Sequence, residues 1–225
     1  MTALLDRIEA ETNQVRTLRA RLRYTVVQGL LGDEQVRFGD LWYAAPDAFP
    51  EDPPGQTAER LAVHLQREKI DGRFGPADQW LIFDGSFFLE RDESARRATR
   101  RALRPERDDQ PAAALPVPIR LDRAEAQRRF EIVQLLGDAR PGDAPEGISL
   151  AFTPRPGVDA RPVRITFDAD SLLPLEVRFG EPDGDLTVFR LIEPELNPDG
   201  IPRERFDTAL PAGSGWDNQS VPFEG

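Results

Sequence analysis

The stretch that decides the fold is Leu18-Arg19-Ala20-Arg21-Leu22-Arg23-Tyr24-Thr25-Val26, where apolar and charged residues alternate. Every even position is apolar and most odd positions are arginine. This period of two residues predicts a strand with one buried face and one face in water. Val36 to Tyr43 also reads as a strand and follows a turn at Gly29 to Asp33, so we expect the two segments to form a hairpin.

The rest of the chain predicts more short strands separated by turns, and two helices. The helices are Thr2 to about Asn13 and Ile119 to Arg129, the second beginning with an N-cap at Leu121-Asp122. Gly72 to Asp78 is expected to be a turn-rich connection, and Asp84-Gly85 a tight hairpin turn. The end of the chain, Phe206 to Trp216, is expected to be a short strand and an irregular tail. The other predicted strands are Leu61 to Leu65, Trp80 to Phe83, Phe87 to Leu89, Ala95 to Leu103, Ile148 to Thr153, Val163 to Phe167, Leu175 to Phe179 and Leu186 to Ile192, and Phe130 to Leu136 is a short apolar segment.

Strands at this spacing predict a mainly β (α+β) fold class. We expect a curved antiparallel half-barrel of about ten strands, with the helices covering its concave face. The length of 225 residues suits a single domain, 1–225, with an irregular tail at 214–225.

The amino-acid composition excludes several classes of protein. The chain has no Cys, one His and a formal net charge of −11. A chain without cysteine forms no disulfide, no Cys-based zinc site and no iron–sulfur cluster, and an acidic surface repels nucleic acid. No apolar stretch approaches the roughly 20 residues that a membrane-spanning helix needs. The start Met1-Thr2-Ala3 indicates either a cytosolic protein or a leader replaced by an engineered Met.

Candidate catalytic residues are few. His64 lies on the polar phase of its strand and is expected to be a surface or edge histidine, since a lone His cannot assemble a metal site. Asp168-Ala169-Asp170-Ser171 lacks the Gly and the distal Glu of a calcium loop and is expected to be a β-turn. The many carboxylates do not exclude an acid/base pair, but the sequence marks none of them out. We therefore expect no enzyme, no cofactor, no metal site and no catalytic residue.

The remaining feature is apolar. Leu18, Leu22, Tyr24 and Val26 are expected to face one side together with Leu41 and Tyr43, and the N-terminal helix adds Leu4, Leu5 and Ile8. From the residues alone, this side is either an ordinary core under tightly packed helices or an apolar cavity under a lid.

Several short motifs occur in an order that resembles a known family. Gly39-Asp40-Leu41-Trp42-Tyr43, followed by Pro46 and Phe49, looks like the signature of the LolA family of periplasmic lipoprotein carriers. Ile82 to Gly85, Leu150 to Pro154 and Phe206 to Gly213 are similar to later motifs of that family, in the same order. The family has Arg directly before the Pro of its signature, where this chain has Ala45.

The resemblance implies an unclosed antiparallel barrel that holds acyl chains in an apolar cavity. The segments Leu4 to Glu11 and Val117 to Ala126 would be lid elements. The residues implied for the cavity and its lid are Leu4, Leu5, Ile8, Leu22, Tyr24, Val26, Leu41, Tyr43, Phe49, Val117 and Ile119.

The function implied is a periplasmic carrier that binds acyl chains of lipoproteins or lipids and delivers them towards the outer membrane. Its partners would be that cargo, an inner-membrane release complex and an outer-membrane acceptor, with no nucleic acid, and the protein would be a monomer. The alternative is a non-catalytic envelope module on the same half-barrel that senses lipids or a partner.

Overall fold

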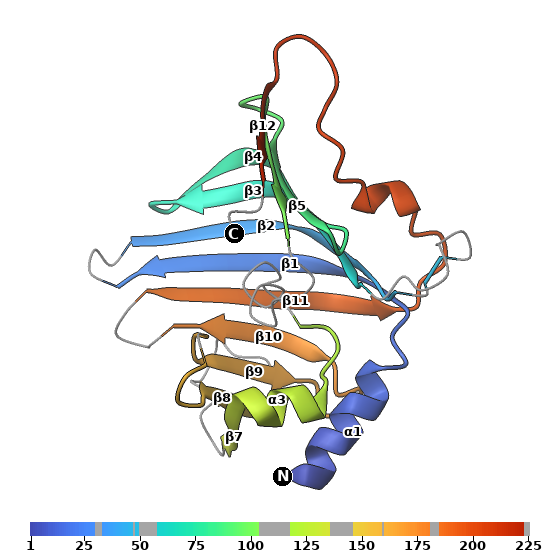
Figure 1. The fold of residues 1–225 in the computed structure, drawn as a ribbon. Coiled ribbons are helices and arrows are strands. Elements are labelled where there is room, and N and C mark those ends of the chain that lie inside the picture. The colour runs from blue at the N-terminus through green and yellow to red at the C-terminus, as the bar shows by residue number, and fades with distance from the viewer. Residues whose placement is uncertain are drawn as a thin grey trace. The chain divides into compact units, whose positions relative to one another are not determined.

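The computed structural model describes residues 1–29, 33–46, 48–49, 58–103, 118–135, 146–158, 160–180 and 185–222 (Figure 1). Two α-helices and one 3-10 helix accompany the strands in these ranges. The helices are α1 (Thr2–Thr12), α3 (Arg123–Arg129) and η1 (Arg203–Phe206). The strands are β1 (Thr17–Gln28), β2 (Asp33–Ala44), β3 (Arg60–Ile70), β4 (Arg73–Phe83), β5 (Phe87–Asp92), β6 (Arg97–Ala102), β7 (Phe130–Leu135), β8 (Ile148–Pro154), β9 (Val163–Phe167), β10 (Pro174–Phe179), β11 (Leu186–Leu196) and β12 (Asp217–Val221).

The strands of the described residues form one open sheet in the order β12-β6-β5-β4-β3-β2-β1-β11-β10-β9-β8-β7. The pairs from β3 to β6 and from β7 to β11 along this order are antiparallel, whereas β12 runs parallel to β6. The predicted fold class, a mainly β protein built on an antiparallel sheet with two helices, is confirmed. The sheet has twelve strands where about ten were expected.

Two segments differ from their predictions. Gly72 to Asp78 is not a turn-rich connection, because only Asp71 and Gly72, both with positive φ, form the turn and β4 begins at Arg73. This two-residue turn with positive φ at both positions is the geometry that joins antiparallel strands most tightly. At the other end, η1 lies where a strand was expected to begin, and β12 lies within the expected irregular tail.

Contacts divide the chain into two compact units, which we describe separately. Unit 1 comprises Met1–Val15, Arg23–Val36 and Pro116–Ile192, and unit 2 comprises Arg16–Leu22, Arg37–Leu115 and Glu193–Gly225. Organisation as a single domain over 1–225 stays a prediction.

In unit 1, α1 is bound to the segment that leads into α3. Arg123 forms an ion pair with Asp6 at 2.8 Å, and its backbone N–H donates to the Glu9 carboxylate at 3.0 Å. The Thr12 hydroxyl accepts from the backbone N–H of Leu121 at 3.3 Å. The start of α3 is fixed in turn by its N-cap, as predicted, since the carboxylate of Asp122 accepts a backbone N–H at 2.9 Å. The two segments that the resemblance assigns to a lid are therefore joined to one another.

The strands of unit 1 have one apolar and one polar face. Apolar residues pair across neighbouring strands, as Leu150 with Ile165 and Val177 with Phe189 do. On the polar face the buried carboxylate of Glu176 forms ion pairs with Arg178 and with Arg190, the second at 2.6 Å. Two arginines supply the charge and hydrogen bonds that a buried carboxylate needs, so this polar group is satisfied.

In unit 2, a core lies on one face of β2 to β6. We call this the Trp42 face. Its buried residues are Trp42, Ala44, Ala62, Ile82, Leu89, Ala98 and Phe206. Because Phe206 belongs to η1, the C-terminal part of the chain completes this core.

Gly39 lies where β2 and β3 approach closely. A Cβ atom at this position would lie 1.8 Å from the backbone carbonyl oxygen of His64 and 2.9 Å from the Cα of Leu65. No side chain fits there unless the backbone of β3 moves. The glycine of the Gly39-Asp40-Leu41-Trp42 motif is thus required by the spacing of two strands.

We expect Gly39→Ala to lower the free energy of unfolding by about 1 to 3 kcal/mol, the cost of forcing a methyl group into a packed site. Gly75→Ala is the matched control, because a Cβ on Gly75 in β4 meets no atom within 4 Å. Urea unfolding of both variants is the measurement. Equal stability of the two variants would contradict the close approach of β2 and β3.

Candidate functional site

The structure buries most of the residues predicted to line a cavity or its lid. Six of them have at most 2% of their surface exposed, namely Leu5, Ile8, Leu22, Leu41, Tyr43 and Ile119. Leu4, Tyr24, Val26 and Phe49 are partly buried, and Val117 lies outside the described residues. Tyr24 stacks on Phe189 with ring centroids 4.6 Å apart.

Within unit 2, Leu41 and Tyr43 point away from the Trp42 face. Successive residues of a strand point to opposite sides, so β2 presents Trp42 and Ala44 on one side and Leu41 and Tyr43 on the other. The same alternation in β3 and β4 adds aliphatic and aromatic residues to the second side. We call this side the Leu41 face, and its members are Leu41, Tyr43, Leu61, Val63, Leu65, Leu81 and Phe83.

The Leu41 face is almost completely shielded from solvent, and its one polar group is the hydroxyl of Tyr43. Leu41, Val63 and Leu65 have at most 1% of their surface exposed. The Tyr43 hydroxyl donates a 2.8 Å hydrogen bond to the carboxylate of Glu59, just before β3. This bond lets the tyrosine place its ring among apolar side chains while its polar atom is satisfied.

Phe49 does not lie on the Leu41 face, where the resemblance groups it. The resemblance groups it with Leu41 and Tyr43, but the structure packs it against the core of the Trp42 face. Its ring centroid lies 5.9 Å from that of Phe206, and the Arg60 guanidinium lies 5.3 Å from its centre. The structure therefore separates the predicted residues of β2 from Phe49.

Ala45 replaces the family arginine at a site without room. It has no exposed surface, and its backbone N–H donates to the carbonyl oxygen of Arg16 at 2.7 Å. A side chain as long as arginine would have to displace its neighbours here. In this chain the predicted lid segments are instead bound by contacts of their own, through Arg123 and Thr12.

Three of the four motifs that resemble the LolA family contribute residues to the Trp42 face and its surroundings. The Thr208 hydroxyl donates to one carboxylate oxygen of Asp84, while the other accepts the backbone N–H groups of Ser86 and Phe87, each at 2.8 Å. The guanidinium of Arg205 lies 4.5 Å from the ring centre of Trp42. Residues from the first, second and last motifs thus meet in one packed assembly.

Among the pockets of the described residues, two are lined by a mixture of charged, polar and apolar side chains. One, in unit 2, has a volume of about 450 Å³ and is lined by Arg60, Asp84, Ser86, Phe87, Arg203, Glu204, Phe206, Asp207 and Thr208. The other, in unit 1, has a volume of about 170 Å³ and is lined by Arg23, Thr25, Val27, Glu34, Arg178, Leu186, Val188 and Arg190. None of the eleven predicted site residues lines either pocket.

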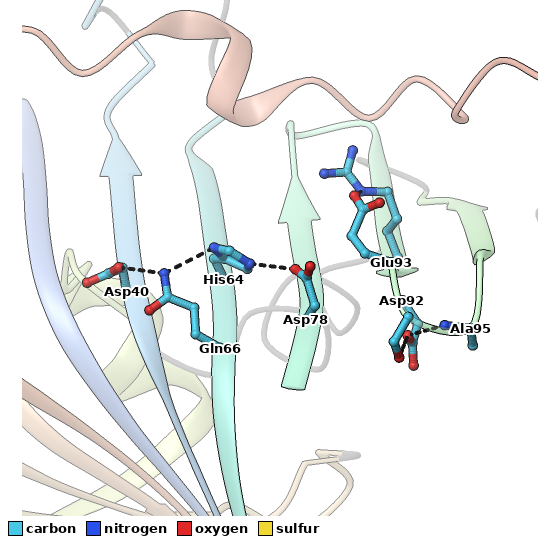
Figure 2. A network of polar contacts seen from close by, with 9 residues as sticks. Asp40, His64, Gln66, Asp78, Asp92, Glu93 and Ala95 are labelled. Atoms are coloured by element: carbon cyan, nitrogen blue, oxygen red, sulfur yellow. Dashed lines mark hydrogen bonds and ion pairs between the residues drawn. The ribbon is translucent and has the colours of Figure 1, made fainter. Parts of the chain in front are cut away.

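The single histidine has partners that the sequence did not reveal (Figure 2). One imidazole nitrogen of His64, Nε2, lies 2.8 Å from Asp78, and the other, Nδ1, lies 3.3 Å from the amide of Gln66. The same amide also donates to Asp40 at 3.2 Å. An amide NH₂ group donates two hydrogen bonds, so Nδ1 accepts and Nε2–H donates to Asp78.

This network fixes the position of the His64 ring, because both ring nitrogens have hydrogen-bond partners. The ring also stacks on Trp80 with centroids 4.0 Å apart. His64 was expected at a surface or edge, but β3 lies inside the sheet and only 20% of the side chain is exposed. Across the described ranges, no group of three or more His, Asp or Glu residues is placed to hold a metal ion.

Asp92, the last residue of β5, begins a turn. The hydroxyl of Ser94 and the backbone N–H of Ala95 donate to its carboxylate at 2.6 and 2.8 Å. These bonds stabilise the charged form and lower the pKa of Asp92 below its ordinary value, against a smaller opposing effect of burial.

The comparisons with known proteins concern the fold. No family model matches the sequence, and no curated protein matches it. Solved structures do match. A chain of the Pseudomonas aeruginosa MucA/MucB complex is 14% identical with a TM-score of 0.46, over 92% of this chain and 60% of that one. A putative outer membrane lipoprotein-sorting protein domain from Vibrio parahaemolyticus is 9% identical with a TM-score of 0.45, over 91% and 95% of the two chains.

A LolA superfamily protein is among these structural neighbours. It comes from Nitrosomonas europaea, is 10% identical with a TM-score of 0.37, and the match covers 90% of this chain and 97% of that one. The chain spans about 60% of the length of the matched chain of the MucA/MucB complex. None of the helices in the described ranges is long and apolar enough to cross a membrane.

We expect Thr208→Val to destabilise the protein by about 1 to 2 kcal/mol, because it removes a hydrogen bond to a charged group while keeping the side chain's shape. Thr99→Val is the control, since Thr99 is buried in β6 without a comparable carboxylate partner among the described residues. Thermal unfolding measures both. If the two substitutions cost the same, the Asp84–Thr208 bond contributes nothing particular.

We expect Ser94→Ala to raise the pKa of Asp92 towards its ordinary value, with Ser94→Thr restoring the shift. A depressed pKa in the folded state stabilises the protein above the unfolded pKa, near pH 4, and this stabilisation disappears as the pH falls through the folded value. The stability difference between wild type and Ser94→Ala should therefore shrink in acid. Carboxyl NMR titration is the measurement, and an unchanged Asp92 pKa would refute the assigned cause.

Proposed function

We propose that the protein is a non-catalytic carrier that binds acyl chains of lipids or lipoproteins along the Leu41 face. The observation that carries this proposal is that unit 2 has two apolar faces. The Trp42 face receives Phe206 of η1, so the chain itself completes that core. The Leu41 face is a second apolar surface over three adjacent strands, and it contains two of the residues that the family resemblance assigns to the cavity.

The chemistry of the Leu41 face suits an acyl chain. Leu41, Val63 and Leu65 offer only hydrocarbon, and the one polar group, the Tyr43 hydroxyl, is already bound to Glu59. Each methylene that leaves water gains about 0.8 kcal/mol, so a lipid tail is stabilised wherever it replaces contacts between apolar side chains. Binding and release then need no covalent chemistry.

The family resemblance assigns the segments of α1 and α3 to a lid, and we propose that the two segments move as one piece. Their apolar residues Leu5, Ile8 and Ile119 are fully buried, and the contacts of Arg123 hold the two segments together. In the family that the chain resembles, a lid that opens exchanges its own apolar contacts for those of the ligand, which permits release without catalysis. By the family resemblance, the carrier works in the periplasm between an inner-membrane release complex and an outer-membrane acceptor.

Val63→Phe tests the proposal by enlarging a side chain on the Leu41 face. We expect it to weaken binding of a fluorescent fatty acid about tenfold, since displacing roughly two methylenes of the ligand costs about 1.6 kcal/mol. Ala62→Val is the matched control. It enlarges the neighbouring residue of β3 on the Trp42 face, where no ligand is proposed.

Thermal melting of both variants separates binding from stability. Weaker binding by Val63→Phe alone, at similar melting temperatures, supports the carrier. Losses of binding that follow the melting temperature in both variants would make the Leu41 face an ordinary core. A wild-type protein that binds no fatty acid at micromolar concentration would reject the carrier function and leave the partner-sensing module.

A further inference from the structure

The tip of the β3–β4 hairpin is unusual because it shows large apolar side chains to water. Phe74 is 59% exposed and Ile70 is 43% exposed, on either side of the turn at Asp71-Gly72. Exposed residues of this size in a soluble domain mark contact sites when they gather at one place. The hairpin is tight, since only two residues join the strands. Figure 1 shows β3 and β4 joined at this turn.

Cations surround the exposed ring. The guanidinium of Arg67 lies 5.2 Å from the centre of Phe74, and the ammonium group of Lys69 lies 5.8 Å from it. Lys69 is the single lysine of the chain. Register pairs Lys69 with Phe74 and Ile70 with Arg73 across the hairpin, so each exposed apolar residue has a basic residue opposite.

The charge at the tip opposes that of the whole protein. Glu68 is neutralised by Arg37, whose Nε lies 3.7 Å from its carboxylate. The other charged residues from 67 to 73 are three cations, Arg67, Lys69 and Arg73, and one carboxylate, that of Asp71. The chain as a whole carries −11, so an anionic surface repels most of it and attracts this end of the hairpin.

We propose that the β3–β4 tip docks on an anionic lipid surface. Phe74 and Ile70 enter the interface between headgroups and acyl chains, while Arg67, Lys69 and Arg73 lie at the level of the phosphates. Apolar insertion and electrostatic attraction each give weak, reversible binding to membranes, and together they give a stable contact. The repulsion of the rest of the molecule orients the docked protein with this hairpin towards the bilayer.

Docking on a membrane does not require that the protein carry an acyl chain. The two proposals are tested by separate measurements, fatty-acid titration for the Leu41 face and vesicle binding for the hairpin tip. A protein that binds fatty acid but not vesicles would keep the carrier function and lose the docking surface, and the reverse result would do the opposite.

Vesicle co-sedimentation of the full chain is the experiment. We expect binding to phosphatidylcholine vesicles that contain phosphatidylglycerol, weaker binding to phosphatidylcholine alone, and a loss of binding at high salt. Phe74→Ser should lower the partition coefficient about tenfold, from the loss of one inserted aromatic side chain. Leu196→Ser is its control, because Leu196 in β11 is also exposed, at 44%, away from the hairpin.

Charge reversal provides the second arm. Lys69→Glu should weaken binding to the anionic vesicles about 30-fold, because the reversal changes the charge by two units and each unit contributes roughly fivefold at a membrane surface. Arg97→Glu changes the same charge on β6 and should leave binding within twofold of wild type. Equal losses in Lys69→Glu and Arg97→Glu would mean a general charge effect and overturn the proposal. So would unchanged binding of Phe74→Ser, no binding by the wild type, or self-association that depends on Phe74.

Discussion

The constraint on which unit 2 depends is that its central strands are apolar on both sides. In β2, Trp42 and Ala44 face one way and Leu41 and Tyr43 the other, and all four are buried. A strand of this kind cannot leave either face in water, so each face needs a cover. The C-terminal part of the chain covers the Trp42 face with Phe206, and the cation of Arg205 lies against the tryptophan ring. The Leu41 face is buried by the protein itself, and the proposed function is that an acyl chain replaces those contacts.

The sequence predicted the fold well wherever local pattern and final structure agree. The alternation from Leu18 to Val26 is a strand, and Asp122 begins a helix as its N-cap. Prediction failed where the pattern was absent. The first half of β4 contains Gly75 and Pro76 and is mostly exposed, so no alternation marks it as a strand. The 3-10 turn at Arg203–Phe206 is similarly set by packing against the Trp42 face rather than by local preference.

The candidate site was predicted in part for the same reason. Leu41 and Tyr43 follow from the alternation of β2, which fixes their common side. The alternation of sides ends with β2 at Ala44, so it does not fix the side on which Phe49 lies. In the structure Phe49 packs on the other side of the sheet, against the Trp42 face. The network of His64 joins residues from three strands, Asp40, Gln66 and Asp78, whose proximity depends on strand register. A single sequence carries no signal for such contacts.

The placement of the aromatic residues has a practical consequence. The three tryptophans of the chain, Trp42, Trp80 and Trp216, all belong to the core of the Trp42 face or pack against it. The indole emission of this protein therefore reports on unit 2, and unit 1 contributes no tryptophan. Loss of far-ultraviolet circular dichroism averages over the whole sheet. A mismatch between the two optical signals during denaturation would reveal whether the halves of the chain melt together or one after the other.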